Sequence, residues 1–185
     1  MKLEQCFGNQ FQMKNNLLRA SCCVLRVLGI DPGTATTGWA LLEEQHGKIS
    51  AIAYGHISTR KENPEDERLM EIHNDLKNII NKYQPEEAAV EDLFFFKNQK
   101  TVIKVAQARG MLLLTLRQNG VKVASYTPLQ VKQALTGYGR AEKKQVQLMT
   151  KSILCLDCIP KPDDTADAIA IALCHINSRK LSSFK

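Results

Sequence analysis

The hydrophobic positions of residues 24–58 predict three strands separated by short turns. Residues 24–30 are almost continuously apolar, which is typical of a strand buried on both faces. A Pro-Gly pair then breaks this strand. Residues 37–43 and 49–58 indicate two further strands joined by a polar turn. Because the connections are short and polar, the three strands are expected to form an antiparallel meander.

From residue 63 onward, helical periodicities alternate with short apolar runs. Apolar residues recur at helical spacing from Leu69 to Tyr83, after an Asn-Pro pair that is expected to cap the helix and fill its first position. Residues 88–90 and 121–126 predict two more strands, with a long helix over 102–118 between them.

The last third of the chain predicts three helices. A short helix begins at a Thr-Pro pair, and residues 141–154 form a second helix whose apolar face carries Val146, Met149 and Ile153. The third is capped by Asp163 or Asp164 and runs to about Asn177. The order of elements predicts an α/β fold with a mixed sheet, an antiparallel meander followed by strand–helix crossovers.

Length and composition fit one domain with a sizeable core. The chain has 185 residues, of which 44% are hydrophobic. Residues 1–23 have weak periodicity and predict a poorly ordered extension, residues 24–179 the domain, and residues 180–185 a C-terminal tail. The extension lacks the apolar core of a signal peptide, and no apolar run approaches the ~20 residues of a membrane span. We therefore expect a cytoplasmic protein that does not enter the membrane.

The net charge and the cysteines say less about function than the pattern of strands and helices says about the fold. Lysine and arginine number 25 against 19 acidic residues, so the net charge is +6, which is compatible with a nucleic-acid partner without requiring one. Cys155 and Cys158 form a lone C-x-x-C pair. Because a zinc site needs two further ligands at a recognisable spacing, reduced cysteines packed as small apolar residues are favoured.

Four carboxylates stand out by their positions. Asp31 and Glu91 end buried strands, and Asp164 and Asp167 share one face at the start of an apolar helix. A strand-ending aspartate can simply cap a turn, and an acid near a helix N-terminus is favoured by the helix dipole. Asp167 is harder to explain, because a buried charge costs several kcal/mol unless it is paired or metal-bound. No lysine or arginine lies nearby in the sequence to neutralise it.

Divalent cations would resolve the repulsion between converging acids. Carboxylate oxygens suit Mg²⁺ or Mn²⁺, and two such ions can activate water and stabilise the leaving oxygen of a phosphodiester. The glycines and threonines of residues 31–38 would also suit a phosphate loop of an actin-like ATPase. Those ATPases, however, need a second phosphate loop and a much longer chain.

Basic and aromatic residues follow the acids. Seven of them would line a phosphate track, or equally a solvated face: Lys97, Lys100, Lys104, Lys132, Arg140, Lys143 and Lys144. Three consecutive phenylalanines, residues 94–96, come shortly after Glu91. At least one of these rings is expected in the core, while another would be exposed for stacking on bases or contacting a partner.

These stretches together resemble the RuvC family of bacterial Holliday junction resolvases, in the RNase H-like superfamily. The resemblance spans residues 24 to about 177 and is carried by VLGIDPGTATTGWA, VEDLFFFKN, QARG, TPLQVKQALTGYGRAEKKQVQLM and DDTADAIAIALCHI. It implies an RNase H-like fold, with a five-stranded mixed sheet flanked by helices. It also implies a structure-selective endonuclease that resolves junctions by paired symmetric nicks, through metal-dependent phosphodiester hydrolysis in recombination and repair.

The resemblance assigns roles to individual residues. It implies that Asp31, Glu91, Asp164 and Asp167 are catalytic acids that bind Mg²⁺, with two ions per site and Mn²⁺ as a substitute. It implies that Phe94 engages bases and that Lys132 and Lys143 contact DNA, and we extend this expectation to Arg140 and Lys144 in the same segment. Expected partners are four-way junction DNA, a second copy of the chain and the RuvA–RuvB branch-migration complex.

Symmetry gives a physical reason for the homodimer. A four-way junction has two equivalent strands to cut, and a two-fold dimer presents two equivalent sites. The long helix after Glu91 is the expected interface. Two other functions stay open at this point: a related nuclease that acts on another nucleic acid, and a non-catalytic module that binds junctions.

Overall fold

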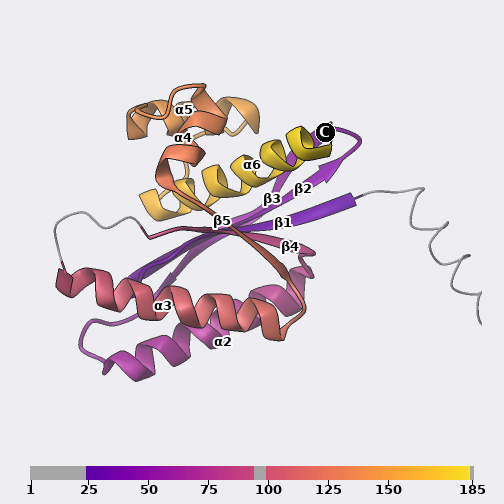
Figure 1. Ribbon diagram of the computed structural model, residues 1–185. Coiled ribbons are helices and arrows are strands. Elements are labelled where there is room, and N and C mark those ends of the chain that lie inside the picture. The colour runs from indigo at the N-terminus through magenta and orange to yellow at the C-terminus, as the bar shows by residue number, and fades with distance from the viewer. Residues whose placement is uncertain (1–23, 94–98, 184–185) are drawn as a thin grey trace, which may run out of the picture.

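The computed structural model describes residues 24–93 and 99–183, which fold into one five-stranded sheet with helices on both faces (Figure 1). The strands lie in the order β3-β2-β1-β4-β5. Their bounds are Val24–Asp31 for β1, Thr36–Gln45 for β2, Lys48–Ser58 for β3, Glu87–Glu91 for β4 and Lys122–Tyr126 for β5. Strands β1, β2 and β3 pair antiparallel, whereas β4 pairs parallel with both β1 and β5. The predicted meander and mixed sheet are therefore confirmed.

Five described helices cover the two faces of this sheet. Helices α2 (Glu65–Tyr83) and α3 (Gln99–Gln118) lie on one face. Helices α4 (Pro128–Thr136), α5 (Lys143–Ile153) and α6 (Asp163–Ser183) lie on the other (Figure 1). None of the helices in the described part of the chain combines the length and apolar character that crossing a membrane requires.

Helix α6 is the buried centre of its layer. Residues 168–174 of this helix are almost completely buried and pack against β1 and β2. Gly29 permits the close approach, since a Cβ atom at this position would overlap the backbone carbonyl oxygen of Ala168. On the other face, Ile72 and Leu76 of α2 and Leu112 of α3 fill a second apolar layer. The two cores hold the sheet rigidly between them.

Helix ends differ from the sequence predictions where local hydrogen bonds decide them. Pro64 is the N-cap of α2, whereas the predicted cap Asn63 donates its side-chain amide to Glu71 Oε1 at 2.9 Å. Helix α3 begins at Gln99 rather than 102, and α6 continues to Ser183 rather than ending near Asn177. Sequence periodicity locates helices better than it locates their ends.

The predicted apolar face of α5 is wrong in two of its three positions. Val146 is buried, but Met149 and Ile153 are 40% and 38% exposed. Helix α5 begins after Ala141 because Glu142 and Gln145 form a capping box there. The helix then buries Val146 and Thr150, which leaves its other apolar positions in solvent.

Candidate active site

Asp31 and Glu91 lie at the same edge of the sheet. Asp31 is the last residue of β1 and Glu91 the last residue of β4. Because these strands are parallel and Ile30 pairs with Val90, both carboxylates project one residue beyond the last registered pair. The carboxyl ends of parallel strands thus bring together two acids that are 60 residues apart in the sequence.

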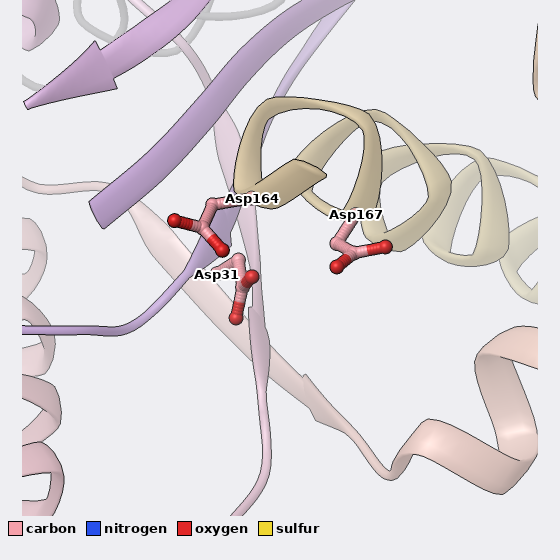
Figure 2. Close-up of side chains that lie close together, drawn as sticks. All are labelled: Asp31, Asp164 and Asp167. Carbon is pink, nitrogen blue, oxygen red and sulfur yellow. The ribbon is translucent and has the colours of Figure 1, made fainter. Parts of the chain in front are cut away.

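Asp164 and Asp167 reach this edge from the first turns of α6. Gly38, which pairs with Asp31 across β1 and β2, allows the contact because a Cβ atom there would overlap the backbone carbonyl oxygen of Asp164. Figure 2 shows the side chains of Asp31, Asp164 and Asp167 directed toward a common space. One carboxylate oxygen from each of the three lies within 4.8 Å of the others.

Burial and mutual repulsion raise the pKa of three of the four predicted acids. Burial is the largest cause for Asp31, and the charges of Glu91, Asp167 and Asp164 add to it, which raises its pKa to about 8. The pKa of Glu91 is raised by burial and by Asp167, although Asp31 and Lys143 oppose the shift. Burial also raises the pKa of Asp167 despite the opposing effect of Lys143. Burial and the closeness of the carboxylates to one another therefore disfavour the charged forms of these three acids.

Lys143 is the positive charge that the local sequence around Asp167 does not reveal. Its Nζ lies 2.8 Å from Asp167 Oδ2 and 3.3 Å from Asp163 Oδ2. Burial lowers the pKa of Lys143, but these two carboxylates outweigh it and the net pKa is raised. The sequence next to Asp167 does not indicate Lys143 as its partner, because Lys143 lies on a different helix.

A cavity of about 190 Å³ opens beside the acids, between α4, α5 and α6. Its charged lining residues are Glu91, Asp167, Lys132 and Lys143. Its walls are apolar and consist of Pro128, Val131, Val146, Ala170 and Ile171. Two carboxylates and two lysines therefore face the same space, where a phosphate group could lie against both charges.

The other predicted DNA-contacting residues have different surroundings. Arg140 and Lys144 are exposed beside the start of α5. Phe94 and Lys97 lie outside the described residues. Lys104 forms a 2.9 Å ion pair with Glu65, so its charge is directed toward α2 rather than toward the acids.

The donor set fits a hard divalent cation. Asp31, Asp164 and Asp167 supply carboxylate oxygens only, which are the ligands that Mg²⁺ and Mn²⁺ prefer. Within residues 24–93 and 99–183, no second group of three or more His, Cys, Asp or Glu side chains is close enough to hold an ion. The described thiols of Cys155, Cys158 and Cys174 are free, but only Cys174 is buried. The expected packing of Cys155 and Cys158 as small apolar residues is wrong, because both are exposed.

The fold and the acidic site together place this chain in the RNase H-like class of nucleases. The model of the family "Crossover junction endodeoxyribonuclease RuvC" matches residues 27–175. The chain belongs to the RuvC family. This membership removes the actin-like interpretation of residues 31–38.

Two relatives and one solved structure show the extent of the similarity. Crossover junction endodeoxyribonuclease RuvC from Syntrophomonas wolfei is 53% identical over 86% of this chain and 93% of its own length. The enzyme of the same name from Halothermothrix orenii is 56% identical over 84% of this chain and 94% of its own. The structure of Thermus thermophilus RuvC in complex with Holliday junction substrate is 34% identical, covers 86% of this chain and 97% of that one, and has a TM-score of 0.78.

Proposed function

We propose that this protein is a crossover junction endodeoxyribonuclease that resolves Holliday junctions by paired symmetric nicks in recombination and repair. The observation that carries this proposal is the convergence of Asp31, Asp164 and Asp167 at the sheet edge where β4 ends in Glu91. The T. thermophilus relative has been solved with a Holliday junction substrate, and the two chains align over most of their lengths.

The four acids are proposed to bind two Mg²⁺ ions, with Mn²⁺ as a substitute. Bound cations supply Lewis-acid activation of water and stabilise the leaving oxygen of the phosphodiester. The protein contributes a rigid cradle, because Asp31 and Glu91 end central strands and Asp167 lies on a buried helix. Burial is the largest cause of the raised pKa of Asp31 and repulsion by the neighbouring acids adds to it, and a bound cation would favour the charged carboxylate against both effects.

Lys132 and Lys143 are proposed to hold the DNA backbone beside the acids. Both line the 190 Å³ cavity, and cations there would offset the repulsion between the carboxylates and an incoming phosphate. Arg140 and Lys144 are exposed and have no ion pair among the described residues, so both are available to further phosphates. Phe94 is proposed to engage bases. Junction recognition would then rest on phosphate positions and shape rather than on base edges.

Helix α3 is proposed to form a two-fold dimer interface. Its outer face exposes a stripe of apolar and small residues, Ile103, Ala106, Gly110 and Leu114. Ile103 and Leu114 are 62% and 57% exposed, and a Cβ atom at Gly110 would meet nothing within 4 Å. Small residues between two large apolar ones permit close helix packing. We further propose a cytoplasmic location and docking on the RuvA–RuvB complex.

Cleavage of a synthetic four-way junction in Mg²⁺, beside linear duplex of the same sequence, tests the function. We expect paired symmetric nicks on the junction alone. Asp31→Asn should bind the junction with wild-type affinity and fail to cut it, because it removes one ionisable ligand with little change in shape. Junction binding without cutting by the wild-type protein, in both Mg²⁺ and Mn²⁺, would instead indicate a non-catalytic module. Faster cutting of linear or hybrid substrates would indicate a related nuclease.

Sedimentation of variants tests the interface separately. Leu114→Glu should convert a dimer to a monomer, because it places a charge in the stripe on α3. Ile52→Glu is the matched control, since Ile52 is 46% exposed on β3. A monomeric wild-type protein, or a dimer that survives Leu114→Glu, would contradict the assignment of α3.

A further inference from the structure

We infer that Arg109 of α3 is a positioning residue for Glu91, and this inference rests on the proposed function. The guanidinium of Arg109 contacts three groups near the end of β4: a backbone carbonyl, a carboxylate and a hydroxyl. Nε donates to the backbone carbonyl of Glu91 at 3.0 Å. Nη2 lies 3.0 Å from Asp92 Oδ1 and 2.8 Å from Ser125 Oγ.

The contacts of Arg109 fix the backbone from which the Glu91 side chain projects. Glu91 is the last residue of β4, and the chain leaves the sheet directly after it. Asp92 is held from two sides, because its backbone N–H donates to the carbonyl of Tyr126 at 2.8 Å while its carboxylate pairs with Arg109. Arg109 thereby ties the end of β4 to both β5 and α3.

The same contacts show why Arg109 acts through Glu91 rather than on DNA. Its side chain is only 18% exposed, and both Nε and Nη2 already have protein partners. These partners engage three of the five guanidinium N–H donors, and the low exposure of the side chain leaves little surface for a phosphate. A planar guanidinium can bridge a carbonyl, a hydroxyl and a carboxylate at once, whereas a lysine ammonium on a flexible stem cannot reproduce this fork.

The expected consequence is a loss of site geometry without a loss of binding. If Glu91 shifts by a fraction of an ångström, the acid cluster binds divalent cations less well and cleaves more slowly, as seen when partners of metal ligands are removed. The lysines that face the cavity do not contact Arg109 in any described interaction, so junction affinity should be preserved.

The test compares Arg109→Met and Arg109→Lys with Arg117→Met, a change at an exposed arginine near the end of the same helix. For Arg109→Met we expect a junction Kd within about twofold of wild type and a cleavage rate lower by roughly 10–100-fold. The Kd for Mn²⁺, measured by titration without DNA, should rise by a similar roughly 10–100-fold. Arg109→Lys should recover part of both losses through its pairing with Asp92, and Arg117→Met should change neither. All variants are assayed at a temperature at which circular dichroism shows them folded.

The Mn²⁺ titration separates this inference from the proposed function. Wild-type Mn²⁺ affinity in folded Arg109→Met would overturn the role of Arg109, and so would a junction Kd that rises in proportion to the loss of cleavage. If the wild-type protein cuts no junction at all, the proposed function fails, but weaker Mn²⁺ binding in Arg109→Met would still support a role at the acid cluster.

Discussion

Lys143 and Asp167 form an ion pair between α5 and α6, with Nζ 2.8 Å from Oδ2. Lys143 is half exposed, whereas Asp167 is more than two-thirds buried. The pair therefore places a solvent-accessible cation on an acid that also faces Asp31 and Asp164. This arrangement offsets part of the negative charge of the cluster and leaves Lys143 half exposed in the lining of the cavity, where a phosphate can reach it.

Lys143→Ala should weaken both binding and cleavage of a junction. Removing a phosphate contact should lower the slope of log K against log salt concentration by about 1. If Lys143 also stabilises charge at the reacting phosphate, the cleavage rate should fall by roughly 10²-fold. Salt titration of junction binding and single-turnover cleavage measure the two effects.

Lys144→Ala separates the effect of losing one positive charge from the effect of losing a charge at the specific position of Lys143. Lys144 is the next residue on the same helix and is exposed, so its removal changes the net charge equally. We expect the same change in salt slope but less than about twofold loss of cleavage. Equal losses of cleavage in both variants would contradict a specific role for Lys143.

The metal-free protein should lose stability as the pH rises from about 5 to 8. The pKa of Asp31 is raised from 3.8 to about 8 in the folded state, so across this range the folded protein binds more protons than the unfolded chain. Stability then falls with increasing pH, because its slope follows the protons bound in the unfolded state minus those bound in the folded state. Thermal melts in a metal chelator measure this trend.

Asp31→Asn identifies the origin of that pH dependence. The variant should flatten the trend and melt at a higher temperature than wild type at pH 8, because it removes a buried charge from the repelling cluster. Adding Mg²⁺ at pH 8 should raise the melting temperature of wild type more than that of Asp31→Asn. A metal-free wild-type protein that is most stable at pH 8 would contradict the charge assignment.

Gly38→Ala should damage both stability and catalysis. A methyl group at this position overlaps the carbonyl oxygen of Asp164, so α6 must move away from β2. Overpacking of this kind costs about 1–3 kcal/mol. A shift of the helix start also carries Asp164 away from Asp31, so cleavage per folded molecule should fall as well. Chemical denaturation and single-turnover cleavage measure the two consequences.

Gly110→Ala is the matched control for the glycine substitution. Its Cβ would meet nothing within 4 Å, and it lies within a helix, where alanine is favoured over glycine by about 1 kcal/mol. Because Gly110 also lies in the stripe proposed as the dimer interface, both glycine substitutions are made in the Leu114→Glu background, where we expect equal or greater stability for Gly110→Ala. Wild-type cleavage by Gly38→Ala would show that the spacing between α6 and the sheet does not set the site.

Glu87→Ala should destabilise the fold while sparing the chemistry. Glu87 Oε2 lies 2.8 Å from His175 Nε2 and 3.3 Å from Arg179 Nε, and Tyr126 hydrogen-bonds the other ring nitrogen of His175. Removing Glu87 leaves the buried ring of His175 without one of its hydrogen-bond partners, which costs about 1–3 kcal/mol. Glu87 begins β4 whereas Glu91 ends it, so cleavage per folded molecule should stay at the wild-type level.

Glu43→Ala tests whether burial explains the expected loss of stability in Glu87→Ala. Glu43 pairs with Arg26 at 3.0 Å, but the arginine side chain is 44% exposed. A pair of this kind contributes about 0–1 kcal/mol. Similar losses of unfolding free energy in Glu87→Ala and Glu43→Ala would contradict a special role for the buried network.

The sequence by itself determined the strands, the helices and the four conspicuous acids. Apolar runs of one strand length ending in Asp31 and Glu91 could be identified because a buried strand must be apolar while its last residue need not be. Asp167 could be identified because an acid among alanines and isoleucines of a helix contradicts simple burial. These inferences use only neighbouring residues, where periodicity is informative.

The tertiary structure decided what those acids face. Strand order brings Asp31 and Glu91 to one edge, and the glycines of β1 and β2 let α6 lie close enough to add Asp164 and Asp167. The partners Lys143 and Arg109 come from separate helices, so no local pattern pairs either of them with its acid. Met149 and Ile153 are exposed for the same reason: periodicity marks the apolar face of a helix, but the packing of α5 determines how much of that face is covered.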